Sequence, residues 1–256
     1  MANYNGHYAE LYDEIYADKQ YDGEVEYIVK LIRRHVFSKK ISVLELASGT
    51  GTHALLFEKK GFSVTASDYS DSMLSVAQKK IKKSDAHITL RKIDMIKIPK
   101  FPKLFDAVLC LFDSIGYVRT NDAIEKVLKG VRTSLVKKGL FIFEFWHEPA
   151  MVKHFEPVRT RDLHLHNGTI AHRVSKTVLD FERSIAEVSY TLDEYKGKKQ
   201  MCHLEEVQEN RFFSIPEMQY LLGKNGFRSL KFFSGYSDKE KITDRSFHIV
   251  CLAQKK

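Results

Sequence analysis

Residues 43–68 constrain the fold of this 256-residue chain more than any other stretch. An apolar run, Ile41–Ala47, leads into a turn that contains Gly49 and Gly51, and a short helical segment then leads to a β-branched run that ends at Asp68. This pattern predicts a strand, a turn, a helix and a second strand. The two glycines let the backbone approach a ligand closely and expose amide N–H groups at the start of a helix.

Two acids in this unit indicate what kind of ligand it binds. Asp68 follows the glycines by about twenty residues, the position from which an acid binds ribose hydroxyls in a Rossmann-type site. Glu45 precedes the turn and would repel a pyrophosphate, but it suits a ligand that carries a cation. Ala54 stands where a dinucleotide motif has its third glycine, which the looser form of that motif allows. A nicotinamide or other nucleotide site therefore stays open as an alternative.

The segments around these acids resemble a known family. Glu45-Leu-Ala-Ser-Gly-Thr-Gly51 resembles motif I of the class I S-adenosylmethionine-dependent methyltransferases, and Asp68-Tyr-Ser-Asp-Ser-Met-Leu74 resembles their following acid motif. S-adenosylmethionine carries a sulfonium and an ammonium and no phosphate, so it would suit Glu45. The expected fold is α/β: a Rossmann-like, doubly wound, mostly parallel seven-stranded sheet with helices on both faces, an N-terminal helical cap and an inserted antiparallel β-sheet.

The pattern along the chain predicts how these parts are divided. Residues 7–35 form two amphipathic helices, and the turn signals Asn167-Gly168 and Lys196-Gly197 separate four segments of an antiparallel sheet. The expected parts are a cap at 1–38, a cofactor-binding core at 39–149 and 213–256, and an inserted sheet at 150–212.

Further segments resemble the nucleotide-sugar N-methyltransferases, although glycine-type and other amine methyltransferases share the cap and the inserted sheet. The matching segments are Ala9–Asp13, Phe112–Gly116, Glu144–Pro149, His203–Glu206 and Arg211–Ser214. The sugar enzymes carry a histidine directly after Ser-Ile-Gly, where this chain has Tyr117. A tyrosine can hydrogen-bond an amine, but with a reference pKa near about 10 it is a poor base at neutral pH. The amine could instead lose its proton to water before it binds.

The resemblance implies a set of cofactor-binding residues. Glu45 and the Gly49 backbone would hold the methionine amine, Asp68 the ribose, and Asp94 with Met95 the adenine. The full expected set is Tyr21, Glu45, Ala47, Gly49, Gly51, Asp68, Tyr69, Met73, Asp94, Met95 and Leu111.

A second set is expected around the methyl acceptor. Tyr12, Tyr16 and Tyr117 are candidates for orienting the amine and for catalysis. Trp146 and His147 would form a wall of the acceptor site, with His147 or Glu148 as a candidate proton acceptor. His164 and His166 share a strand face but lack a third ligand, so we expect no metal.

Composition limits the remaining possibilities. The net charge of +8 permits an acidic partner, but the paired lysines fall at expected helix ends or turns, which favours a small-molecule acceptor, one that can carry phosphates, over nucleic acid. Three scattered cysteines fit a reducing cytoplasm, and no long apolar span indicates a membrane segment. The chain would act as a monomer or a homodimer. An RNA (tRNA) methyltransferase and a non-catalytic S-adenosylmethionine-binding partner protein remain as alternatives.

Overall fold

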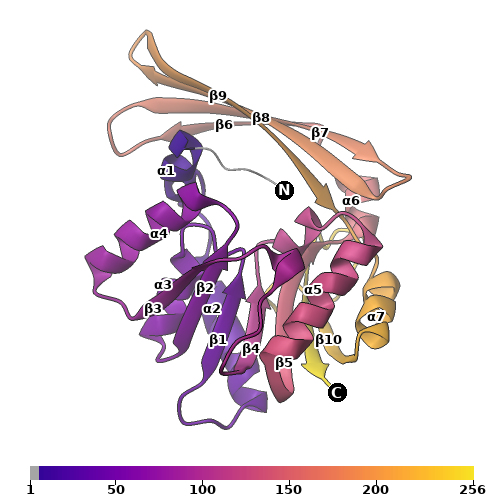
Figure 1. Cartoon of the computed structure of the whole chain (residues 1–256). Coiled ribbons are helices and arrows are strands. Elements are labelled where there is room, and N and C mark those ends of the chain that lie inside the picture. The colour runs from indigo at the N-terminus through magenta and orange to yellow at the C-terminus, as the bar shows by residue number, and fades with distance from the viewer. Residues whose placement is uncertain (1–5) are drawn as a thin grey trace.

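The computed structural model of the chain describes residues 6–256, which form two β-sheets and the helices around them (Figure 1). The strands of the larger sheet are β1 (Ser42–Leu46), β2 (Ser63–Asp68), β3 (Ile88–Lys92), β4 (Phe105–Cys110), β5 (Leu135–Trp146), β10 (Phe227–Ser234) and β11 (His248–Lys255). Those of the smaller sheet are β6 (Val158–His164), β7 (Ile170–Asp180), β8 (Ile185–Lys196) and β9 (Lys199–Arg211). The first five residues of the expected cap lie outside the described part.

The helices alternate with the strands of the larger sheet. The α-helices are α1 (Gly6–Ile15), α2 (Tyr21–His35), α3 (Thr52–Lys59), α4 (Asp71–Ser84), α5 (Asn121–Ser134), α6 (Glu148–His154) and α7 (Ile215–Lys224), and two short 3₁₀ helices are η1 (Met95–Lys97) and η2 (Ser114–Tyr117). Local caps explain several of these starts. Ser70, Thr120 and Ser214 each accept a hydrogen bond from a backbone N–H in the first turn of α4, α5 and α7, respectively.

The larger sheet has the strand order β10-β11-β5-β4-β1-β2-β3. The five neighbouring strands β3, β2, β1, β4 and β5 pair in parallel. Strand β11 is antiparallel to both of its neighbours, β5 and β10. The smaller sheet, β6-β7-β8-β9, is antiparallel throughout. The predicted α/β fold class, with a mostly parallel seven-stranded sheet and a separate antiparallel sheet, is confirmed.

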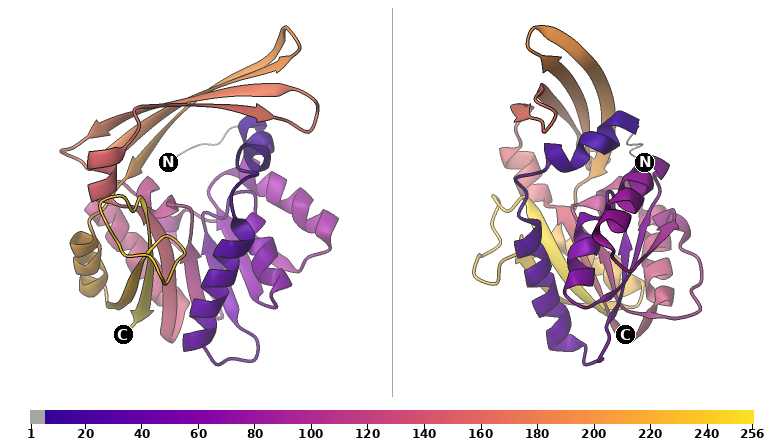
Figure 2. Two further views of the ribbon diagram at one scale, coloured as in Figure 1. Left: turned by 180° about the vertical axis from the view of Figure 1, so that it is seen from behind. Right: turned by 90° about the vertical axis from the view of Figure 1, so that its left-hand side faces the viewer.

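Helices cover both faces of the larger sheet (Figure 2). One apolar cluster joins α5 and α7 to the sheet, with Val127 and Leu221 in the same cluster as Phe141. The other joins α2 and α3 to the opposite face, with Ile28 and Phe57 in the same cluster. Because both faces are buried, the central strands are apolar almost continuously, as the sequence of β4 is.

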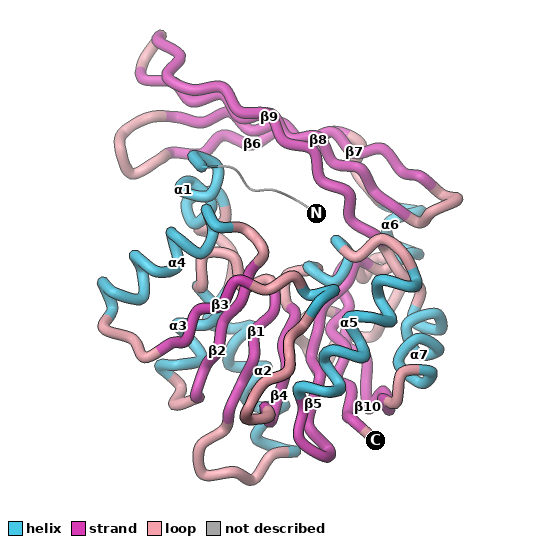
Figure 3. Tube along the Cα trace, viewed as in Figure 1, coloured by secondary structure: helices cyan, strands magenta, loops and turns pink. Residues whose placement is uncertain are grey.

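The connections fix where a ligand can bind. β1 leads into α3 and the adjacent β4 leads toward α5, and these two helices lie on opposite faces of the sheet. Such a reversal opens a crevice at the carboxyl ends of the strands. The loops that follow β1, β2 and β4 lie on the side of the sheet that faces the smaller sheet (Figure 3).

The N-terminal helix and the smaller sheet pack together above this edge (Figure 1). Tyr8, Leu11 and Ile15 of α1 share one apolar cluster with Leu163 and Leu192 of the smaller sheet. The division into a cap at 1–38, a core at 39–149 and 213–256, and an inserted sheet at 150–212 stays a prediction. No helix within residues 6–256 is long and apolar enough to cross a membrane.

Candidate active site

A cavity of about 830 Å³ lies between the strand ends of the larger sheet and the underside of the smaller one. Its floor includes Gly49 from the turn after β1 and Asp68 from the end of β2, and its roof includes Arg173 and Tyr190 from β7 and β8. A narrower pocket of about 30 Å³ continues beside the β1–α3 turn and shares Gly49 with it. One continuous site is thus built from both sheets.

The glycine turn and the acid after β2 hold each other in place. Gly49 has a φ of +54°, and a Cβ placed on it would meet no atom within 4 Å, so its backbone faces open space. Its N–H donates to Asp68 Oδ2 at 2.8 Å, and the Ser70 N–H donates to Asp68 Oδ1 at 2.8 Å. Both carboxylate oxygens of Asp68 are therefore held in a fixed orientation at the cavity wall. Burial raises the pKa of Asp68 above its ordinary value.

Glu45 is a buried acid without a full set of partners. Its side chain is 2% exposed, Oε1 lies 3.8 Å from His53 Nδ1, and Oε2 has no hydrogen-bond partner among the described residues. Burial, and then the charge of Asp68, raises the pKa of Glu45 to about 8. A buried carboxyl group in this state is stabilised by a cation at hydrogen-bond distance. The ammonium of S-adenosylmethionine supplies such a group, so the residues present fit this cofactor.

Tyrosines and an arginine also line the cavity. The rings of Tyr12 and Tyr16 lie 4.7 Å apart, and the Tyr16 ring meets Phe112 edge-on at 5.1 Å. Arg173 donates to the Tyr16 hydroxyl at 3.2 Å, and the Tyr117 hydroxyl donates to Gln208 Oε1 at 3.2 Å. These contacts tie α1 and η2 to the smaller sheet around an aromatic wall.

Most of the residues expected from the sequence meet here. The large cavity is lined by Tyr12, Tyr16, Ala47, Gly49, Asp68, Tyr69, Met73, Met95, Tyr117 and Trp146. The narrower pocket adds Tyr21, Glu45 and Leu111.

Four expected residues line neither space: Gly51, Asp94, His147 and Glu148. Gly51 precedes α3 as its N-cap with a φ of +77°, a conformation that favours glycine, and a Cβ on it would lie 3.3 Å from Ala77 Cβ of α4. Asp94 caps η1 by accepting from the Ile96 N–H at 2.9 Å.

The expectation for His147 needs a correction. Its side chain is buried beside the Ser246 carbonyl oxygen, 3.1 Å from Nδ1, and burial lowers its pKa. His147 is not among the residues that line the cavity, so the structure does not place it in the predicted wall.

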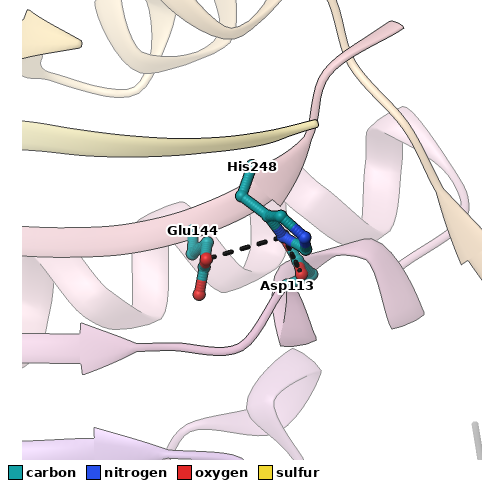
Figure 4. A group of neighbouring side chains, drawn as sticks. All are labelled: Asp113, Glu144 and His248. Atoms are coloured by element: carbon teal, nitrogen blue, oxygen red, sulfur yellow. Dashed lines mark hydrogen bonds and ion pairs between the residues drawn. The ribbon is translucent and has the colours of Figure 1, made fainter. Parts of the chain in front are cut away.

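Sequence reasoning missed a cluster at the back of the cavity, made of Asp113, Glu144 and His248 (Figure 4). Asp113 and Glu144 are almost fully buried, and both lie beside Nδ1 of His248, with Asp113 Oδ2 at 2.7 Å and Glu144 Oε1 at 3.6 Å. The two acids fall inside motifs that the sequence indicated. Nothing in the sequence around His248 links it to them, because it follows Glu144 by more than a hundred residues.

The fold and the site together define a class. An open α/β sheet with a glycine turn after its first strand, an acid at the end of its second and a ligand-sized cavity at the switch point is a nucleoside-cofactor-binding domain. Glu45 points to a cationic cofactor within that class.

Comparisons with known proteins agree with this class. Residues 43–139 match the family described as "Methyltransferase domain". The chain is 26% identical over 249 residues to the putative methyltransferase YqeM of Bacillus subtilis (strain 168), covering 91% of this chain and 90% of that one. It is 30% identical over 194 residues to the dTDP-3-amino-3,6-dideoxy-alpha-D-glucopyranose N,N-dimethyltransferase of Streptomyces fradiae, covering 74% and 72%.

A solved structure has the same fold. An S-adenosylmethionine-dependent methyltransferase from Clostridium acetobutylicum ATCC 824 superposes with a TM-score of 0.82 at 22% identity and covers 97% of this chain and 98% of its own. The chain belongs to the S-adenosylmethionine-dependent methyltransferases, and it is an enzyme that uses S-adenosylmethionine as its cofactor.

Proposed function

We propose that the protein N-methylates a small amine, specifically the amino group of an amino sugar carried on a nucleoside diphosphate. The observation that carries the proposal is the cavity of about 830 Å³ between the cofactor side of the larger sheet and the smaller sheet. A volume of this size is typical of sites that enclose a cofactor or another small molecule. The Streptomyces fradiae relative, by its name, dimethylates a dTDP-linked amino sugar.

On the cofactor side we assign Glu45 to the methionine ammonium and Asp68 to the ribose hydroxyls. The buried and unpartnered Glu45 Oε2 supports the first role, and the two backbone N–H groups that orient Asp68 support the second. We place the adenine near Met95, which lines the cavity, with Asp94 beside it. The bound cofactor supplies an electrophilic methyl group on a sulfonium.

On the acceptor side, the protein must align the amine with that methyl group and exclude water. We assign this positioning to Tyr12, Tyr16 and Tyr117, with Trp146 as part of the wall. Their rings and hydroxyls are held by neighbours within the cavity, which limits the positions that an amine can take.

Arg173 is the side chain that suits a phosphate-bearing acceptor. Arg159 and Arg161 also line the cavity, but each lies 2.9 Å from an acid, Glu156 and Asp18 respectively. Within residues 6–256 Arg173 has no carboxylate partner, and its buried Nε has no hydrogen-bond partner. A guanidinium in this state is well suited to the oxygens of a diphosphate.

The proposal is tested by measuring S-adenosylhomocysteine release with a panel of acceptors. The panel holds amino sugars on nucleoside diphosphates, the same sugars without the nucleotide, glycine and other small amines, and bulk tRNA. We expect turnover with the nucleotide-linked sugars. Arg173→Gln should raise their KM by about tenfold or more, the effect of losing one charged hydrogen bond. It should raise the KM of free amines by less, because for them it removes only the hydrogen bond that holds Tyr16.

Other outcomes would separate the alternatives. Turnover on tRNA alone would contradict the small-molecule proposal and assign the positive charge to RNA binding, which salt should then weaken. Tight cofactor binding without turnover on any acceptor would support a non-catalytic partner protein.

A further inference from the structure

Methylation of an amine releases a proton, and the two proton acceptors expected from the sequence, His147 and Glu148, are not among the residues that line the cavity. When the C–N bond forms and the C–S bond breaks, the nitrogen gains a positive charge, and one N–H bond must then break to give the neutral product. The Tyr117 hydroxyl already donates to Gln208, and His147 lies outside the cavity. We therefore expect the proton acceptor to be another titratable group that lines the cavity.

His248 has the geometry of a held base. It lines the cavity at the start of β11, and its side chain is 47% exposed. Nδ1 faces the two carboxylates, which leaves Nε2 on the opposite edge of the ring (Figure 4). A histidine whose Nδ1–H is bound by a carboxylate keeps a fixed tautomer with Nε2 free to accept a proton.

The carboxylates are themselves held firmly. Glu144 Oε2 accepts from the Phe112 N–H and from the Tyr236 hydroxyl, both at 2.8 Å. Asp113 sits in a turn where it and Phe112 both have a φ of +54°, a conformation that costs energy and persists only where the surroundings impose it. Asp113 Oδ1 is buried without a hydrogen-bond partner among the described residues. The cluster thus keeps negative charge beside the imidazole ring.

This environment matches the basicity of His248 to that of an amine. The charge of Asp113, supported by Glu144, raises the pKa of His248 to about 9, while burial and the positive charge of Lys19 oppose the increase. Burial and then Asp113 raise the pKa of Glu144 to about 7. Aliphatic ammonium groups have pKa values of about 8 to about 10, against about 6.5 for a free imidazole. Proton transfer from an ammonium to His248 is therefore nearly balanced instead of strongly uphill.

We propose that His248 is a catalytic residue that takes the proton of the methylated amine on Nε2, with Asp113 and Glu144 as positioning residues that orient the ring and stabilise its protonated form. The inference rests on the proposed methylation of an amine. The N–H electron pair stays on nitrogen, the proton moves to Nε2, and it passes from there to solvent through the open side of the ring.

The test combines a titration of the free protein with the pH dependence of turnover. Histidine NMR should give a pKa of about 9 for His248 in the wild type and a value near about 6.5 in Asp113→Asn. Since the neutral ring is the active form, wild-type kcat should rise with pH toward about 9, and Asp113→Asn should move this rise to lower pH by more than about one unit. His248→Asn should remove the rise and lower kcat by about a hundredfold or more.

His203 offers a matched control, because its Nδ1 lies 2.6 Å from Asp193 on the smaller sheet and it does not line the cavity. His203→Asn should leave the kcat profile unchanged. A profile that stays in place in Asp113→Asn, while NMR shows the His248 pKa to have fallen, would overturn the inference and leave amine methylation intact. Activity that a chelator removes and a divalent cation restores would also overturn the inference, because the cluster of Asp113, Glu144 and His248 would then be a metal site. No turnover on any amine would overturn the proposed function itself, and the role of His248 with it.

Discussion

At the scale of single residues, burial of Glu45 opposes the stability of the fold. Glu45 is 2% exposed, and its pKa is raised to about 8, above the value of about 4.3 for an exposed glutamate. An acid shifted in this direction contributes most to stability below its unfolded pKa, and that contribution is lost as the pH rises through the folded pKa. At neutral pH, the buried Glu45 side chain therefore lowers the free energy of unfolding of the ligand-free protein, and we expect its benefit to lie in cofactor binding.

Glu45→Gln should separate the two effects. Without ligand the variant should unfold at a higher temperature than the wild type at pH values of about 7 to about 8, by at least about 2 °C, because a gain of 1 kcal/mol has an effect of that size in a chain of this length. Its affinity for S-adenosylmethionine should fall about tenfold or more. Scanning calorimetry and titration calorimetry measure the two quantities.

The pH dependence gives the control. Wild-type affinity for the cofactor should increase between pH values of about 6 and about 8, as Glu45 ionises, and then level off. In Glu45→Gln this increase should be absent. An equal dependence in both proteins would show that another group binds the ammonium.

The positions of site residues were predictable from the sequence where a local motif carries them, and their roles stay a prediction. Glu45 and Asp68 stand at fixed spacings around one turn, and the structure places them at the same site. His248 could not be found in this way, because it meets Glu144 only through the antiparallel pairing of β11 with β5. Gly51 belongs to the predicted motif but does not line the cavity. It lies instead where the start of α3 approaches α4.

At the scale of elements, the contact between η2 and β9 joins the two sheets. The Asn210 side chain donates to the Asp113 carbonyl oxygen at 3.4 Å, and Gly116 lies directly against this strand. A Cβ on Gly116 would collide with Asn210 and would lie 2.7 Å from the Arg211 carbonyl oxygen. The close approach places Tyr117 and Asp113 at the cavity.

Gly116→Ala should therefore push η2 away from β9. We expect a loss of about 1–3 kcal/mol in the free energy of unfolding and a larger proportional loss in kcat than in cofactor affinity, because the glycine turn after β1 is not touched. Chemical denaturation and steady-state kinetics check both.

Gly223→Ala in α7 is the matched control, since a Cβ there meets no atom within 4 Å. It should leave kcat unchanged and should not destabilise the protein. Equal kinetics in the two variants would contradict the role given to the η2–β9 contact.

At the scale of the whole molecule, α1 and the smaller sheet form a cover over the core. Their shared cluster includes Leu192, which is 1% exposed, together with Ile15 and Leu163. The order of strands and the turn signals made this sheet predictable. How the sheet lies over the cavity was not predictable, because it depends on contacts between segments that are distant in the sequence.

Leu192→Ala should loosen this cover without unfolding the core. Removing the buried side chain costs about 2–5 kcal/mol, and the loss should appear as faster hydrogen exchange in α1 and β6 with unchanged protection in β4 and β5. Val178→Ala, at a position that is 67% exposed on the same sheet, should change neither region. Faster exchange throughout the larger sheet would show that cover and core unfold as one unit.

The most direct measurement is to supply S-adenosylmethionine with a deuterated methyl group and to locate the label in the product by mass spectrometry and NMR. With an amino sugar on a nucleoside diphosphate, we expect the label on the amine nitrogen. Label on a hydroxyl, on the nucleobase or only on RNA would contradict it, because the cavity and its proton-accepting cluster would then serve a different acceptor.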